Sequence, residues 1–327
     1  MRKVCLFWLL LCSIATAAQE FEYEGMLFRV LSDSTVKVSN HDYMRGRRDT
    51  SYHYNKEANI PKLIGDIVIP QKVRYLEKDF TVTEIGDSAF MHCFDMTSVS
   101  IPNTITKIGR YSFRSSCITH FQIPQSVKHI GNGAFYHADM TNIVLPDTMD
   151  YIGESAFYAC RNLNSIKIPY GIKTIKRFCF YSSSISIIYI PETVTTIEQV
   201  GINSDIFIDF MLHDIQDGKV CIFCNCKIPP TCVDVVLYSP ILKNWDKYPS
   251  GYRLYVPHES IALYEAAEQW NYLNIRSIES ATEVDAVSAN VPEVGRYDMM
   301  GHKITGSCKG VNVVRYADGT TKKVLVR

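Results

Sequence analysis

The densest group of residues that could do chemistry is a run of four cysteines. They follow the pattern Cys-x-x-Cys-x-Cys and then a fourth thiol, at Cys221, Cys224, Cys226 and Cys232. Zinc is bound by thiolates, but its sites usually join two well-spaced pairs, and no second such pair follows here. Disulfides are an alternative in an exported protein. We expect free thiols that serve as small core residues, with no metal and no cofactor.

The common catalytic and phosphate-binding signatures are missing from the sequence. It contains no His-Glu-x-x-His, no Gly-x-Ser-x-Gly and no Walker-type loop. Glu22 and Glu24 are expected on an edge strand rather than as a catalytic pair. Lys+Arg and Asp+Glu both number 34, and no strongly basic domain occurs, so bulk attraction to nucleic acid is excluded. We therefore expect a protein that is not an enzyme and does not bind nucleic acid.

A short motif, Ile-Gly-x-x-Ala/Ser-Phe, returns along the chain at a period of 22–23 residues. Its isoleucines, some in degraded copies, are Ile85, Ile108, Ile130, Ile152, Ile175 and Ile197. An aliphatic residue followed by proline keeps the same step, with prolines at Pro102, Pro124, Pro146, Pro169 and Pro191. A fixed period in the low twenties is typical of a repeat solenoid.

Each unit contains a short strand that alternates and is ended by the proline. Because alternate side chains of a strand point to opposite faces, one expected inward row is Val99, Phe121, Ile143, Ile166 and Ile188. A second is Ile101, Ile123, Leu145, Ile168 and Ile190, and the third is Phe90, Phe113, Phe135, Phe157 and Phe180. The glycines Gly86, Gly109, Gly131 and Gly153 are expected where the backbone bends tightly or takes a positive φ. No unit can bury its own face, so neighbours must stack.

The same alternation defines two outward rows, which are our candidate ligand-binding residues. One row is Ser100, Gln122, Val144, Lys167 and Tyr189, and the other is Ser98, His120, Asn142, Ser165 and Ile187. A strand face of this kind is either a long binding surface or simply a solvated side of a sheet. Tyr136, Tyr158 and Tyr181 each follow a repeat phenylalanine. We expect them to cover the outer edge of the core, with a second binding row as the alternative.

The N-terminal residues have a basic start, an apolar run from Val4 to Ile14, and then small residues. This pattern predicts a secretory signal peptide cleaved after Ala17 or Ala18. The apolar run is too short to span a bilayer, and no later stretch is apolar enough to do so.

The repeat pattern closely resembles the BspA-like, or Treponema pallidum type, leucine-rich repeat family. The resemblance implies five repeats, an N-terminal β-hairpin cap with a first longer unit, and an irregular C-terminal unit with a short helix. We expect that helix at Ser260–Trp270, with Leu263 and Ala267 on one face. Proteins of this family are secreted or displayed on bacterial surfaces, and several act in adhesion.

The last residues, after a linker low in aromatics, resemble the C-terminal sorting domain of type IX secretion substrates. The resemblance lies in YDMMGHKI, KGVNVVRY and DGTTKKVLV, and Asp318-Gly319 is a hairpin turn signal. The expected organisation begins with a signal peptide (residues 1–18) and an N-terminal cap with the first longer repeat (19–81). The leucine-rich repeats (82–204), an irregular C-terminal region (205–280) and the linker with its sorting-like tail (281–327) follow.

The expected function is non-covalent binding of a macromolecule at the cell surface or outside the cell. The ligand is a host protein, another bacterial surface protein or a glycan. The alternatives are a structural or self-assembling surface component and, with less support, an enzyme whose site lies in residues 205–278, where no set of acid, base and nucleophile stands out.

Overall fold

The computed structural model describes residues 19–39, 63–198, 220–233, 252–281 apart from Gln269 and Tyr272, and four strands near the C-terminus. The expected signal peptide and nearly all of the expected linker lie outside the described residues. The same holds for parts of the expected C-terminal region.

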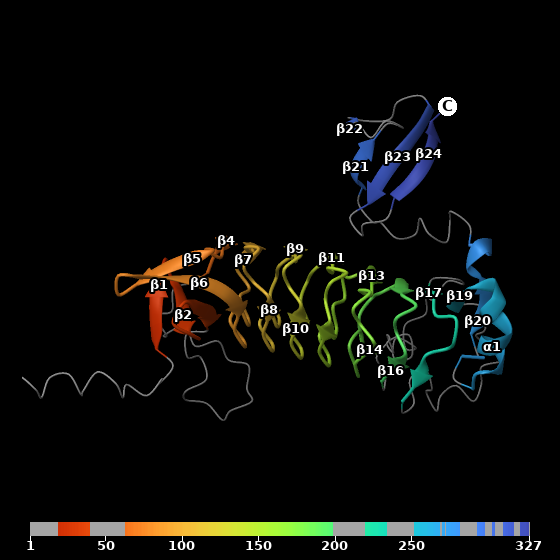
Figure 1. Ribbon diagram of the computed structural model, residues 1–327, viewed down its shortest axis with the longest axis horizontal. Coiled ribbons are helices and arrows are strands. Elements are labelled where there is room, and N and C mark those ends of the chain that lie inside the picture. Colours follow the sequence, from red (N-terminus) through yellow and green to blue (C-terminus); the bar gives the residue numbers. More distant parts are fainter. Residues whose placement is uncertain are drawn as a thin grey trace, which may run out of the picture.

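The chain begins with three antiparallel strands, β1 (Glu20–Tyr23), β2 (Met26–Val30) and β3 (Thr35–Ser39). β3 then pairs in parallel with β6 (Lys78–Ile85), which also pairs with β5 (Lys72–Tyr75) in an antiparallel hairpin. The N-terminal strands are therefore continuous with a sheet of the repeats and cover its first strand (Figure 1).

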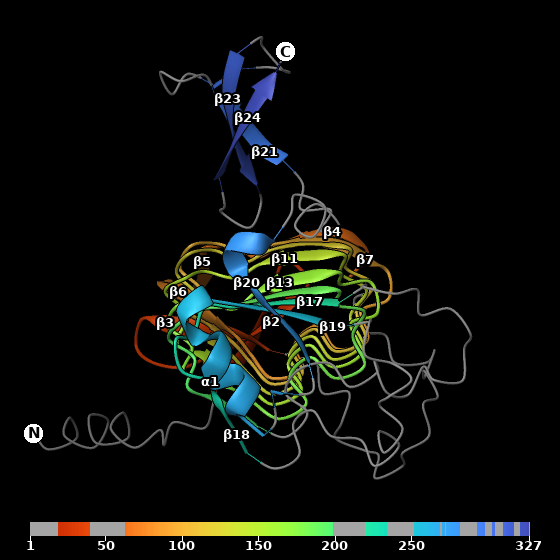
Figure 2. The same ribbon diagram turned by 90° about the vertical axis from the view of Figure 1, so that its right-hand side faces the viewer.

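Successive repeats stack as coils, with parallel strands along two sides (Figures 1 and 2). The first side holds β4 (Gly65–Val68), β7 (Met96–Ser100), β9 (His120–Gln122), β11 (Asn142–Val144), β13 (Ser165–Lys167), β15 (Ile187–Ile190), β17 (Val220–Cys224), β19 (Tyr252–Val256) and β20 (Asn274–Ser277). The second side holds β6 and then β8 (Lys107–Ile108), β10 (His129–Ile130), β12 (Tyr151–Ile152), β14 (Thr174–Ile175), β16 (Thr196–Ile197) and β18 (Thr231–Cys232).

Strand pairing breaks at the same place on both sides, between β11 and β13 and between β12 and β14. The segment from Phe157 to Ile166 spans nine steps of the chain, whereas the corresponding segment from Phe135 to Ile143 spans eight. The break coincides with a coil that carries one extra residue, but Phe90 and Val99 are also nine steps apart and β7 still pairs with β4 and β9, so the extra residue alone does not account for the break.

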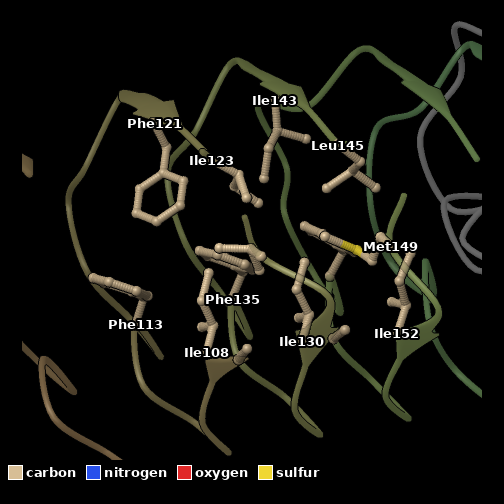
Figure 3. Close-up of a cluster of buried hydrophobic side chains, with 14 of the residues drawn as sticks. Ile108, Phe113, Phe121, Ile123, Ile130, Phe135, Ile143, Leu145, Met149 and Ile152 are labelled. Atoms are coloured by element: carbon tan, nitrogen blue, oxygen red, sulfur yellow. The ribbon is translucent and has the colours of Figure 1, made fainter. Parts of the chain in front are cut away.

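The core lies between the two sides and includes the three inward rows, which confirms their predicted orientation (Figure 3). The phenylalanines are at most 1% exposed, and all members of the other two rows are buried except Ile101, which is half-buried. Rings of successive coils stack in parallel, with centroids 5.1, 5.5, 5.3 and 5.5 Å apart from Phe90 to Phe180. Each buried ring contributes about 1.5–3 kcal/mol, and only a neighbouring coil can cover it.

Glycine is required at the repeat positions for a different reason from the positive φ that we expected. Gly109, Gly131 and Gly153 do not take a positive φ. A Cβ on Gly131 would instead lie 2.7 Å from the backbone nitrogen of Arg110, and one on Gly153 would lie 2.5 Å from that of Asn132. Glycine stands here because the backbones of adjacent coils approach too closely for any side chain.

Positive φ occurs at two other positions of each coil, two residues before and two residues after the phenylalanine. The earlier position is held by Ser88, Tyr111, Gly133, Ser155 and Phe178, and the later one by His92, Ser115, His137, Ala159 and Ser182. Only one of these ten residues is glycine, so the coils hold most of them in a conformation that side chains disfavour.

The closing region contains the short helices η3 (His258–Ser260), α1 (Ile261–Ala266) and η4 (Ile278–Ser280). The expected helix at Ser260–Trp270 is shorter in the structure, because α1 ends at Ala266 and Ala267 has extended backbone. Leu263 is 52% exposed, whereas Tyr264 and Trp270 are buried. The hydroxyl of Tyr264 donates to the carbonyl oxygen of Cys226 at 2.9 Å, and Nε1 of Trp270 donates to that of Pro230 at 3.1 Å. These two bonds hold the aromatic rings inward.

The last strands form a separate antiparallel sheet in the order β22-β21-β23-β24. Their bounds are β21 (Glu293–Tyr297), β22 (Lys303–Ile304), β23 (Gly310–Tyr316) and β24 (Thr321–Val326). Arg315 of β23 pairs with Thr321 of β24. The connection between them contains Asp318-Gly319, where a hairpin turn was predicted.

A buried serine gives a stability test of the core. The hydroxyl of Ser112 is buried and has no hydrogen-bond partner among the described residues, while other coils carry alanine at its position, as at Ala134. Leaving such a hydroxyl unsatisfied costs about 1–3 kcal/mol. We expect Ser112→Ala to raise the free energy of unfolding in urea by about 1 kcal/mol or more. Ser183→Ala, which removes a 2.6 Å bond to the carbonyl oxygen of Phe180, should lower it. Equal losses in both variants would contradict this account.

Candidate functional site

The two predicted outward rows lie on the first side of the array, in register across its strands. Ser98 pairs with His120 and His120 with Asn142, while Lys167 pairs with Tyr189. Ser100 and Gln122 are exposed, and Ser98, Asn142, Val144, Ser165, Lys167 and Tyr189 are half-buried. The structure therefore brings residues from five repeats together on one surface.

A shallow hollow opens on this surface where strand pairing breaks between β11 and β13. Five of the predicted residues line it, namely Asn142, Val144, Ser165, Lys167 and Tyr189. Nζ of Lys167 lies 3.2 Å from Oδ2 of Asp147, so the ammonium group has a carboxylate partner. The hollow thus combines an amide, a hydroxyl, an ion pair and an aromatic ring, which suits recognition of a polar group of a ligand.

Asp66 extends the row at its N-terminal end, and the sequence reasoning did not single it out. Its Oδ1 accepts hydrogen bonds from Oγ of Ser98 at 2.6 Å and from Oγ1 of Thr97 at 2.8 Å. These bonds, of which the one from Ser98 has the larger effect, hold the pKa of the exposed Asp66 carboxyl below its usual value. Asp66 directly precedes Ile67, the first residue of an Ile-Val-Ile-Pro run like those of the repeats, and this position could have indicated that it belongs to the row.

Asp66, Ser98 and His120 lie on adjacent strands, but their order does not fit a catalytic triad. A triad needs the histidine between the serine and the carboxylate, so that the imidazole accepts the serine proton. Here the backbone register places Ser98 in the middle, and its hydroxyl donates to Asp66. The row fits hydrogen bonding to a ligand better than nucleophilic attack.

The prediction that Ile187 faces outward to solvent is wrong. Ile187 is fully buried in a small cluster with Cys221, Phe223 and Tyr255, against which Ile278 and Ala281 pack. Tyr189, Phe223 and Tyr255 stack as a ladder, with centroids 4.9 and 4.8 Å apart. The chain leaving β20 covers the outward face at this end, so the open surface runs from β4 to about Tyr189.

The four clustered cysteines do not converge on one point. Cys221 packs on the outward face of β17, whereas Cys224 belongs to the inner core. Sγ of Cys224 lies 3.2 Å from the hydroxyl of Tyr264, and Sγ of Cys226 donates to the carbonyl oxygens of Pro191 and Val194. Because two of the thiols face opposite sides of one strand, all four cannot ligate a single zinc ion.

Residues 83–205 match the family described as BspA type leucine rich repeat region, in six copies rather than the five we expected. The match covers less than half of the chain and supports a leucine-rich repeat fold in that region.

The chain is also similar to several solved structures of bacterial proteins. A T. pallidum leucine rich repeat protein is 19% identical, with a TM-score of 0.43 over 55% of this chain and 75% of its own. A leucine rich cell surface protein of Faecalibacterium prausnitzii is 18% identical, with a TM-score of 0.48 over 93% of this chain and 60% of its own. The pneumococcal vaccine antigen PcpA is 20% identical, with a TM-score of 0.44 over 57% of this chain and 47% of its own. Comparison with curated proteins finds no match.

The buried thiols give a test by chemical modification. Burial raises the pKa of Cys160 to about 12 and that of Cys93 to about 11. A thiol with a pKa near 12 is about 0.01% thiolate at pH 8, and only the thiolate reacts. We expect native protein at pH 8 to leave Cys160 unmodified by iodoacetamide in mass spectrometry, while urea-unfolded protein reacts fully. Rapid native labelling of Cys160 would contradict its place in the core.

Proposed function

We propose that this protein binds a macromolecular ligand non-covalently through the outward rows between β4 and Tyr189, at the cell surface or outside the cell. The observation that carries the proposal is the alignment of chemically varied side chains from consecutive repeats on one open face. Stacked repeats commonly use such a face to contact partners, because each repeat adds its own residues to an extended surface.

The chemistry of the face supports several ligand classes. Serine, asparagine and glutamine side chains hydrogen-bond peptide and sugar groups alike, and Tyr189 adds apolar area with a hydroxyl. The ligand is a host protein, a surface protein of another bacterium or a glycan. Binding needs no covalent chemistry, and the described row that does hold a carboxylate, a serine and a histidine, Asp66, Ser98 and His120, is not ordered as a catalytic triad.

Placement outside the cytoplasm is supported by the signal-like N-terminus and the sorting-like tail. No helix among the described residues is long and apolar enough to cross a bilayer. We infer that the chain is exported through its N-terminal segment and that residues 281–327 direct it across the outer membrane by the type IX route.

Ligand arrays test the binding proposal. Full-length mature protein is applied to a mixed array of glycans and extracellular-matrix proteins, beside the variant Gln122→Ala/Lys167→Ala/Tyr189→Ala. The matched control carries Gln125→Ala, Lys128→Ala and Tyr151→Ala, outside the outward rows. We expect a ligand whose binding falls by roughly tenfold or more in the first variant only, as for residues central to an interface.

A ligand retained by the first variant would move the site away from this face. No ligand at all, together with concentration-dependent association in ultracentrifugation, would favour the self-assembling alternative. Melting curves of both variants distinguish lost contacts from lost structure.

Deletion of the tail tests the export proposal. The chain without residues 281–327 is expressed in the bacterium that naturally produces the protein. We expect these cells to retain it inside the outer membrane, where added protease cannot reach it. The full chain should be digested on intact cells or found in the medium. A tail-deleted protein that still reaches the surface would show that these residues are not the sorting signal.

A further inference from the structure

One edge of the array carries a continuous series of aromatic rings and guanidinium groups, mostly stacked, in which Tyr181 and Phe178 meet edge to face. It lies on the turns that join each short strand of the second side to the next strand of the first side. From one end to the other its members are Arg110, Tyr111, Arg114, Tyr136, Tyr158, Tyr181, Phe178 and Arg177, and we call it the Arg–Tyr edge.

The contacts between neighbours in the stack are close. Tyr136 and Tyr158 are 4.4 Å apart between ring centroids, and Tyr158 and Tyr181 are 5.1 Å apart. The guanidinium carbon of Arg114 lies 4.8 Å from the ring of Tyr136 and 5.3 Å from that of Tyr111. At the two ends, Arg110 lies over Tyr111 at 4.7 Å and Arg177 over Phe178 at 5.2 Å.

Two aromatic members of the edge occupy the position at which every described coil has a positive φ. Tyr111 and Phe178 have φ of 52° and 55°, at a position that other coils fill with serine or glycine. A bulky residue in this region is an outlier that the surroundings must hold in place. The next coil makes room for Tyr111, since a Cβ on Gly133 would lie 2.2 Å from its ring. Two aromatic side chains are thus placed on the edge at a conformational cost.

The edge presents hydrogen-bond donors in a fixed arrangement. Stacking covers faces of the Tyr136, Tyr158 and Tyr181 rings, and Nη2 of Arg110 donates to the hydroxyl of Tyr111 at 3.4 Å. Arg110 and Arg177 are exposed, and Tyr136, Tyr158 and Tyr181 are half-buried. Tyrosine and arginine are the residue types that dominate binding energy at protein interfaces, and rings already held in place lose little entropy on binding.

The pattern of charge points to a protein rather than to a uniform polyanion. Arg110 and Arg177 occupy the position three residues before the phenylalanine, and Asn132 and Glu154 hold that same position in the two coils between them. Asp139 is also exposed on an intervening coil. A polyanion of even charge would face these carboxylates, whereas a peptide can place its own carboxylates opposite the two arginines alone.

We propose that the Arg–Tyr edge binds an extended segment of a partner protein that carries two carboxylates about four residues apart. Arg110 and Arg177 are three coils apart, which is about 14 Å at the usual strand spacing, and an extended peptide advances about 3.3 Å per residue. Each carboxylate accepts from one terminal guanidinium, and the tyrosine hydroxyls contact the peptide between them. This site is distinct from the outward rows.

Synthetic peptides test the site directly. The probes are twelve-residue peptides on a neutral background, with two aspartates separated by two to eight residues, a neutral peptide, and heparin oligosaccharides. Binding of the full mature chain is measured by biolayer interferometry. We expect the tightest binding at a separation of four to five residues, at least tenfold weaker binding in Arg110→Gln/Arg177→Gln, and a change under twofold in the charge-matched control Lys107→Gln/Lys173→Gln.

Tyr158→Phe provides a second variant that keeps the ring and removes only its hydroxyl, and it should weaken binding severalfold. The glutamine substitutions lie on exposed side chains, so melting temperatures should stay near that of the unchanged protein. The proposal is overturned if neutral peptides bind as well as acidic ones or if no peptide binds. It is equally overturned if both double variants lose binding alike, or if heparin binds through the arginines while the peptides do not.

Discussion

The constraint on which the rest of the structure depends is that each coil must be covered by the next. The phenylalanine rings stack at 5.1–5.5 Å, and backbone hydrogen bonds join successive coils, as from Gly131 to the carbonyl of Ile108 at 2.8 Å. This spacing brings the backbones so close that Gly131 and Gly153 admit no side chain. Because every coil repeats the same path, each surface position is carried along the array in a straight row.

Rows of this kind give the protein two separate surfaces from one framework. On the first side the row from Asp66 to Tyr189 is open, polar and hollowed where a coil gains one residue. Beyond Tyr189 the same rows become apolar, and Ile278 and Ala281 close over them. The return of the chain thus limits the length of the open face and keeps Phe223 and Tyr255 from water.

The second surface is the Arg–Tyr edge, which is formed by residues of the turns rather than of the strands. Tyr136, Tyr158 and Tyr181 follow the phenylalanines of consecutive coils, and their rings stack. They do so because the spacing of the coils nearly equals the preferred separation of aromatic rings. Arginines fill the ends and the junction of this stack. A surface built in this way is rigid before any partner arrives, in contrast to a loop that must order on binding.

The period, the inward rows and the outward orientation of most candidate residues were all readable from the sequence, because they depend on strand alternation and on a motif repeated every 22–23 residues. Both are local properties that survive whatever the rest of the chain does. The burial of Ile187, the role of the repeat glycines, the contact of Asp66 with Ser98 and the arginine contacts of the tyrosine row were decided by the tertiary structure alone. Each depends on how one coil lies against another or on where the chain returns, and distances between coils are not encoded in the spacing of residues along one strand.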